Sequence, residues 1–203
     1  MRLVFFCLIL ITVNKGFCQK WSFEYWHDGK LVLEEGDTLR GKIKYEINSD
    51  IIEIDQNNRL QSFTARKVIY YEIFDAITSI YRQFYSIPYS ATGGYKTPIF
   101  FELLSEGKLT LLAREALEYK SSSVGYYGYG SISRWILVNK YFVLNNKGVV
   151  EEFSGRKSDL LLLMEKRDDE VRKFMKSNKL DIDHKYDLAR VFTFYNSLFP
   201  TSN

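Results

Sequence analysis

The sequence has little cysteine, histidine and proline: its 203 residues include two Cys, two His and three Pro. Two cysteines cannot form the disulfide framework that holds a small secreted scaffold together. Two histidines leave little material for a metal site built on imidazole ligands. Hydrophobic residues make up 46% and charged residues 26%, which is ordinary for a globular chain and excludes a disordered or collagen-like one. The length predicts one domain, or at most two.

The N-terminal segment has the order of a secretory signal peptide. Arg2 supplies a positive start, residues 3–13 form an almost unbroken apolar run, and Gly16 and Cys18 fill the small-residue positions of a cleavage site. The run is eleven residues long, whereas a membrane-spanning helix needs about 20, so an uncleaved anchor is the weaker alternative. A lipid-modified cysteine needs a small residue before it, and Phe17 in that position disfavours lipidation of Cys18.

Removal of residues 1–18 changes the composition of the chain that functions. We expect a mature chain of 185 residues that begins at Gln19, contains no cysteine and carries 26 basic against 25 acidic side chains. The cysteines and basic residues that leave are Cys7, Cys18, Arg2 and Lys15. A cysteine-free, nearly neutral chain excludes thiol catalysis, thiolate metal sites and disulfides, and it gives no general electrostatic reason to bind nucleic acid. It is long enough to be stabilised by its own core.

Residues 19–154 read as a succession of strands. In residues 38–47, Leu39, Ile43 and Tyr45 alternate with charged side chains, and Gly41 occupies a core-side position that suggests a bulge or close packing. Similar patterns and turn residues predict about ten strands, at residues 30–34, 38–47, 50–54, 60–64, 67–74, 79–87, 95–104, 108–119, 132–144 and 148–153. No crossover helix lies between them, so we expect a mostly antiparallel sheet, either a sandwich or an open barrel.

Residues 155–203 change to a helical period. Acidic residues at 168–170 suit a first helical turn, and residues 188–199 carry an apolar stripe after Asp183, which we expect to be the N-cap of the last helix. Two or three amphipathic helices should therefore pack on the sheet. No linker separates the two parts, so the prediction is a single α+β domain over residues 19–203.

Few residues are arranged for catalysis. His27 precedes Asp-Gly and is expected in a turn, far in sequence from His184. Neighbouring acids in strands point to opposite faces and do not form acid–base pairs. The Ser-x-x-Lys sequence that begins at Ser154 lacks its companion motifs and is expected to mark a helix start. We therefore assign no catalytic residue, metal ligand or cofactor.

Residues 121–131 (SSSVGYYGYGS) break the strand pattern and predict a flexible loop. Tyrosine among serine and glycine makes adaptable contact surfaces, so Tyr126, Tyr127 and Tyr129 are candidate binding residues, against the alternative of a long loop without a function. The aromatic strands around Tyr70 and residues 81–89 are a second candidate surface, although most of their rings are expected in the core.

Three pieces of sequence carry a resemblance to known proteins. They are GDTLRGKI at residues 36–43 followed by Tyr45, FTARKV at residues 63–68, and the tail with KSDL at residues 157–160, NKL at 178–180 and Tyr195-Asn196. The set resembles an uncharacterised family of exported β-rich proteins from Bacteroidota-type bacteria. The resemblance implies a secreted β-rich domain with a helical tail, and it brings no known activity.

These observations predict an exported protein of the periplasm or cell envelope with a non-enzymatic binding or structural role. Its partner would be an envelope protein or a glycan, with no transmembrane span after signal removal. The alternatives are a hydrolase acting on envelope glycans or peptides, or an accessory of surface assembly or transport. Converging carboxylates in a cleft, or a buried His–acid pair, would favour the hydrolase.

Overall fold

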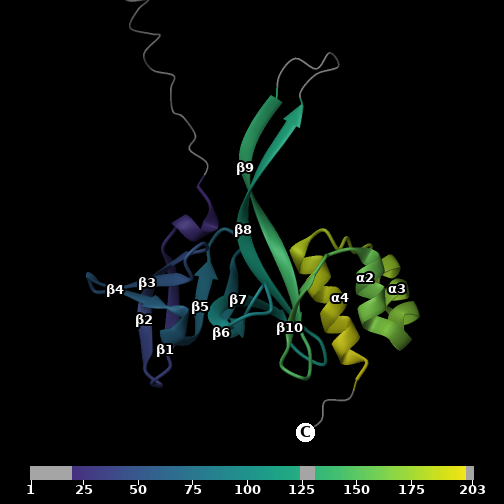
Figure 1. Ribbon diagram of the computed structural model, residues 1–203, viewed down its shortest axis with the longest axis horizontal. Helices are drawn as coiled ribbons and strands as arrows, with labels where there is room; N and C mark the ends of the chain where they lie inside the picture. The colour runs from purple at the N-terminus through teal and green to yellow at the C-terminus, as the bar shows by residue number, and fades with distance from the viewer. Residues whose placement is uncertain (1–19, 124–130, 200–203) are drawn as a thin grey trace, which may run out of the picture.

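The computed structural model describes residues 20–123 and 131–199 (Figure 1). The predicted signal peptide, with its cleavage site at Cys18 and Gln19, lies outside the described residues. So do the candidate binding residues Tyr126, Tyr127 and Tyr129.

Ten strands form one open antiparallel sheet, which confirms the α+β class and the mostly antiparallel sheet of about ten strands. The strands run in the order β10-β9-β8-β7-β6-β5-β1-β2-β3-β4, so β1 lies between β2 and β5 and the sheet has β10 and β4 as its edges. Their bounds are β1 His27–Leu33, β2 Thr38–Glu46, β3 Ile51–Gln56, β4 Arg59–Thr64, β5 Val68–Asp75, β6 Ile80–Tyr89, β7 Thr97–Ser105, β8 Thr110–Ser123, β9 Ser131–Leu144 and β10 Val150–Phe153.

The sequence of β2 shows why these segments become strands. Ile43 and Tyr45 are buried while Lys42 is exposed, as the alternation predicts. The β3–β4 hairpin turns at Asn57 and Asn58, which both have positive φ. Two successive residues with positive φ are what the tight primed hairpin turn requires, and asparagine tolerates that conformation.

Two glycines allow close packing in the β1–β2–β5 region. Gly29 of β1 pairs with Gly41 of β2. A Cβ on Gly41 would lie 2.3 Å from the carbonyl oxygen of Asp55, and one on Gly29 would lie 2.3 Å from that of Glu72. Close packing at Gly41 is therefore confirmed. The turn expected at His27 is wrong, because this segment is paired β-strand on both sides.

The C-terminal part is helical: α2 Lys157–Met164, the 3-10 turn η3 Glu165–Arg167, α3 Asp168–Ser177 and α4 Lys185–Ser197. The helix start after Ser154 and the acidic first turn of α3 are as predicted. The N-cap of α4 is His184 rather than Asp183. The reason is local: the backbone N–H of Asp183 donates to the Asp181 carboxylate in a turn that precedes the helix.

Helix α4 joins the tail to the sheet by packing on β7 and β8, and α3 covers its other side (Figure 1). Asn196 of α4 donates to the carbonyls of Glu106 and Leu109, which fastens the β7–β8 turn. The core between helices and sheet is built by Leu111, Val143, Phe153, Leu160, Leu161, Met164, Val171, Met175, Leu188, Val191, Phe192 and Tyr195. Within residues 20–123 and 131–199, no helix is both long and apolar enough to cross a membrane.

A second core lies on one face of β1, β2, β3, β5, β6 and β7, and a small third core lies on the opposite face of the sheet at β7, β8 and β9. The second contains Leu31, Ile43, Tyr45, Ile52, Ile54, Ala65, Val68, Tyr71, Ile73, Phe84 and Phe100. The third contains Phe101, Leu112 and Phe142. Of the rings in the aromatic strands, Tyr71 and Phe84 lie in the second core and stack with 4.5 Å between ring centroids. The expectation that most of these rings lie in the core is wrong, because Tyr81 is exposed and the other rings, those of Tyr70, Phe74, Tyr85 and Tyr89, are only half-buried.

The β8–β9 hairpin is much longer than its neighbours and projects from the body (Figure 1). Its ladder runs from Thr110↔Leu144 to Ser123↔Ser131, but β7 pairs only as far as Ala113 and β10 only as far as Tyr141. We call residues 114–123 and 131–140 the arm. Residues 121–123 and 131, expected in a loop, are paired strand in the arm, because serine accepts the extended conformation once the partner strand is present.

The packing at Gly29 gives a test of the fold. Gly29→Ala should lower the free energy of unfolding by about 2–3 kcal/mol, because its Cβ meets the backbone of β5. Gly94→Ala is the matched control, since Gly94 has no positive φ and its nearest neighbour atom is 3.9 Å away, and it should change stability by less than about 0.5 kcal/mol. Urea unfolding measures both. Equal effects of the two substitutions would contradict the close packing.

Candidate functional site

Three charged side chains meet on the buried face of the central strands. Arg82 of β6 donates from Nε to Glu102 Oε1 at 3.0 Å and from one terminal nitrogen to Glu102 Oε2 at 2.7 Å. The same terminal nitrogen donates to Glu115 Oε1 at 2.6 Å. A two-pronged pair of guanidinium and carboxylate is the strongest arrangement that these groups can adopt.

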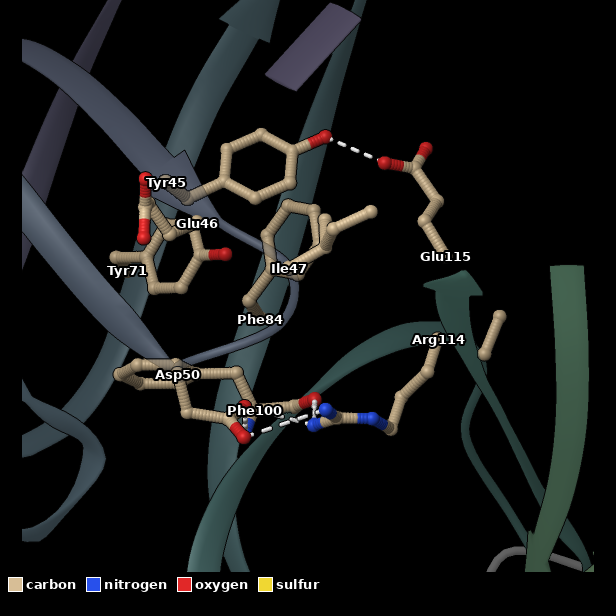
Figure 2. Close-up of a pocket in the computed structure, with 10 residues that line it drawn as sticks. Tyr45, Glu46, Ile47, Asp50, Tyr71, Phe84, Phe100, Arg114 and Glu115 are labelled. Atoms are coloured by element: carbon tan, nitrogen blue, oxygen red, sulfur yellow. Dashed lines mark hydrogen bonds and ion pairs between the residues drawn. The ribbon is translucent and has the colours of Figure 1, made fainter. Parts of the chain in front are cut away.

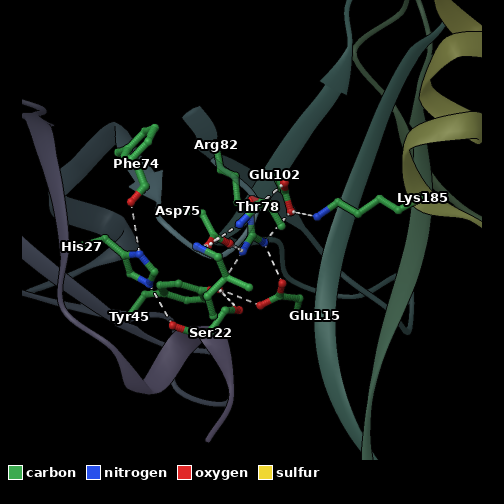
Figure 3. Close-up of polar contacts among 11 residues, drawn as sticks. Ser22, His27, Tyr45, Phe74, Asp75, Thr78, Arg82, Glu102, Glu115 and Lys185 are labelled. Atoms are coloured by element: carbon green, nitrogen blue, oxygen red, sulfur yellow. Dashed lines mark hydrogen bonds and ion pairs between the residues drawn. The ribbon is translucent and has the colours of Figure 1, made fainter. Parts of the chain in front are cut away.

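Three further residues, Tyr45, Asp75 and Lys185, form hydrogen bonds to these charged side chains (Figure 3). The other terminal nitrogen of Arg82 donates to the Tyr45 hydroxyl at 3.2 Å and to Asp75 Oδ2 at 3.4 Å. The Tyr45 hydroxyl donates in turn to Glu115 Oε2 at 2.7 Å. Lys185, at the start of α4, donates to Glu102 Oε2 at 2.5 Å. We call Tyr45, Asp75, Arg82, Glu102, Glu115 and Lys185 the Arg82 cluster.

Burial governs the electrostatics of the Arg82 cluster. The side chains of Arg82 and Glu102 are each 3% exposed, so neither charge could remain there alone. Burial raises the pKa of Glu102, but Arg82 and Lys185 outweigh it, and the net pKa lies below the ordinary value. Burial lowers the pKa of Lys185 despite the opposing attraction of Glu102. Burial also raises the pKa of Tyr45, which keeps its hydroxyl protonated as a donor.

Tyr45 and Glu115 of the Arg82 cluster line a small pit (Figure 2). The pit has aromatic walls from Tyr71, Phe84 and Phe100, and its volume of about 30 Å³ is room for little more than one water. Binding sites for small molecules usually have roughly 300–1,000 Å³. The donors of Arg82 are already occupied by carboxylates and a hydroxyl. The cluster is therefore arranged to hold the fold together rather than to perform chemistry.

His27 is buried at the start of β1, and it does not form a His–acid pair. Its Nε2 lies 2.8 Å from the Ser22 carbonyl oxygen and its Nδ1 lies 3.3 Å from that of Phe74. These contacts tie the short 3-10 turn η1 (Ser22–Glu24) to β5. His184 is exposed at the N-terminus of α4 beside Asp181.

A polar groove of about 720 Å³ is the place where a hydrolase would be sought. Four carboxylates, those of Glu118, Glu152, Asp181 and Asp183, line it together with Lys140, Arg156 and Lys157. None of the four is buried. A general acid at neutral pH needs a carboxyl group withdrawn from water, which this groove does not provide. Among the described residues, no three His, Cys, Asp or Glu side chains are grouped to hold a metal ion.

A second groove, of about 440 Å³, lies at the base of the arm and is lined by Trp21, Asn48, Leu117 and Trp135. We call it the tryptophan groove. Beside the groove, Tyr119 lies directly opposite Trp135 in the ladder. The two rings pack edge to face, with 5.3 Å between their centroids. These two side chains remain 60% and 56% exposed, respectively. Exposed aromatic pairs of this kind are typical of contact surfaces.

The Arg82 cluster supports both walls of the tryptophan groove. On one wall, Ser22 follows Trp21, and its Oγ lies 3.5 Å from the hydroxyl of Tyr45. On the other wall, Glu115 is held by Arg82 and precedes Leu117 by two residues, so both side chains lie on the same face of β8. The cluster thus positions two segments that are distant in sequence.

Sequence reasoning missed both the cluster and the groove, although part of the signal was present. Arg82 alternates with Ile80 and Phe84 on one parity of its strand, where a charge is unexpected. Glu102 and Glu115 converge on Arg82 although they are not adjacent in sequence, a pairing that examination of neighbouring acids could not find. Both tryptophans lie in segments given no functional reading, and only the fold brings them together.

Comparison with protein-family models, with curated proteins and with solved structures gave no match.

The lowered pKa of Glu102 predicts how stability depends on pH. A carboxyl group whose pKa is lower in the folded than in the unfolded state stabilises the folded protein at pH values above its unfolded-state pKa. This stabilisation is lost as the pH falls through its folded-state pKa. Glu102→Gln should cost about 3 kcal/mol at pH 7 and should weaken the loss of stability on acidification. Urea unfolding between pH 7 and pH 3 measures both effects.

The control for this experiment is Glu151→Gln, at an exposed position of the edge strand β10. It should leave the stability and its pH dependence as in the wild type. If the stability of the Glu102→Gln variant falls on acidification as steeply as that of the wild type, the result would contradict a stabilising role of the ionised Glu102 carboxylate.

Proposed function

We propose that the protein is exported and acts in the cell envelope by binding, with the arm and the tryptophan groove as its contact surface. The observation that carries this proposal is the exposed Tyr119–Trp135 pair on a hairpin that extends beyond its neighbouring strands. An isolated two-stranded ribbon is marginally stable in water, and a partner lying on it would add the packing that it lacks.

Two sequence features support the proposal that the protein is exported. The order of charge, apolar run and small residues in residues 1–18 is that of a signal peptide, and the remaining chain has no cysteine to be oxidised outside the cytoplasm. The hydrolase alternative has less support. None of the acids of the polar groove is buried, and the buried acids of the Arg82 cluster are engaged with Arg82 and Lys185.

Co-sedimentation with isolated cell envelopes of the organism that encodes the protein tests this function. The mature chain, residues 19–203, should sediment with the envelopes in a saturable way. A Tyr119→Ser/Trp135→Ser variant should bind roughly thirtyfold more weakly, which corresponds to about 2 kcal/mol for a pair of central aromatic anchors. The protein recovered from the envelope fraction of the producing cells should begin at Gln19.

The matched control is Tyr95→Ser, which removes a ring that is 81% exposed in the β6–β7 connection and remote in sequence from the arm. It should sediment as the wild type does. Circular dichroism of each variant verifies that the fold is retained. Absence of envelope binding by the wild type, or equal binding of the arm variant and the wild type, would contradict the proposed function.

A further inference from the structure

All three tryptophans of the chain lie outside its hydrophobic cores. Trp26 and Trp135 are 43% and 56% exposed, and Trp21 is half-buried at the tryptophan groove. The cores are instead built with phenylalanine and tyrosine, such as Tyr71, Phe84 and Phe101. Tryptophan is on average a highly buried residue in folded proteins. Two of three tryptophans facing one groove therefore indicate a contact role.

The walls of the tryptophan groove are fixed before any ligand arrives. The backbone N–H of Trp21 donates to the Glu24 carboxylate at 3.2 Å, and the N–H of Glu24 donates to the Trp21 carbonyl at 3.0 Å. Trp135 lies in an uninterrupted antiparallel ladder opposite Tyr119. A ligand that enters such a groove loses little affinity to ordering of the protein. The volume of about 440 Å³ suits a small ligand or a few units of a polymer.

The chemistry of the lining favours a neutral ligand with both apolar and hydroxyl-bearing surfaces. None of the four lining residues is charged, which disfavours an anionic polymer. Indole rings present flat faces of negative potential, on which the C–H faces of a pyranose ring can stack. The Asn48 side chain is exposed, and its amide can donate to and accept from sugar hydroxyls.

An extended peptide fits this groove less well than a sugar. Leu117 and Trp135 belong to cross-strand pairs on one face of the arm, so the groove lies over side chains and not along a strand edge. A peptide bound there would find no row of backbone N–H and C=O groups to pair with, and backbone pairing is the usual source of affinity for added strands. The hydroxyl groups of a bound sugar can instead remain hydrogen-bonded to water, so a sugar needs no row of backbone groups.

We propose that the tryptophan groove is a binding site for neutral glycans, whose pyranose rings stack on Trp21 and Trp135. This inference rests on the proposed binding function of the arm, and it names the chemical class of the ligand. The hydroxyl groups of the bound sugar contact Asn48, and Leu117 packs against its apolar edge.

Titration of intrinsic tryptophan fluorescence and calorimetry with the mature chain test the proposal. The probes are hexasaccharides of β-linked glucose, N-acetylglucosamine and mannose, with polygalacturonate as the anionic probe and a valine-rich decapeptide as the extended one. At least one neutral hexasaccharide should bind saturably. Trp135→Ala and Trp21→Ala should each weaken this binding at least tenfold, and Asn48→Asp should weaken it by placing a charge in the groove.

Trp26→Ala is the matched control, because it removes an exposed tryptophan that does not line the groove, and it should bind as the wild type does. Binding of the anionic polymer or the peptide but of no neutral sugar would overturn the glycan proposal. Failure of every neutral sugar, with envelope sedimentation still dependent on Tyr119 and Trp135, would overturn it and leave the proposed function standing. Failure of both experiments would reject both proposals.

Discussion

The guanidinium group of Arg82 forms hydrogen bonds to side chains of four other strands, β2, β5, β7 and β8 (Figure 3). Lys185 of α4 joins the same group by donating to Glu102 of β7. These elements belong to the curved N-terminal part of the sheet, to the base of the arm and to the helical tail. Apolar packing inside each part is not directional, so it does not by itself define how the parts are oriented. Charged hydrogen bonds of fixed geometry can define that orientation.

A buried group of this kind is a costly way to gain stability. Removal of charges from water is unfavourable, and well-packed apolar side chains are often as stabilising as a buried ion pair. The cluster nevertheless contains three carboxylates and two cations, with Tyr45 as an additional donor. Its effect on structure is specificity: the Ser22 turn and the Glu115 segment, which flank the tryptophan groove, are held relative to each other through Tyr45 and Arg82.

The sequence was sufficient for the local structure. Alternation in residues 38–47 predicted β2, and the stripe through Leu188 and Phe192 predicted α4, because both patterns arise from one buried face. The mistakes were also local. Asp28-Gly29 looks like a turn, yet Gly29 is needed where two backbones approach closely. Asp183 looks like the N-cap of α4, yet its backbone N–H donates to the Asp181 carboxylate in a turn before the helix. The N-cap is the next residue, His184.

The site could not be predicted because it depends on which strands become neighbours. Insertion of β1 between β2 and β5 brings Tyr45 towards Arg82 across 37 residues of sequence and towards Glu115 across 70. Alternation gives the face of a strand on which a residue lies, but not the strand beside it. Trp21 and Trp135 illustrate the same limit, because only the fold brings these two side chains to the same groove.

Hydrogen exchange of the Glu115→Gln variant, measured by mass spectrometry, is the most direct test that the Arg82 cluster positions the groove. We predict faster exchange in residues 21–26 and 114–120 together, with no change in residues 51–64 of β3 and β4. Glu118→Gln, a change of the same kind on the opposite face of β8, should leave all three segments unchanged. Unchanged exchange in the Glu115→Gln variant, or the same loosening caused by Glu118→Gln, would contradict the account.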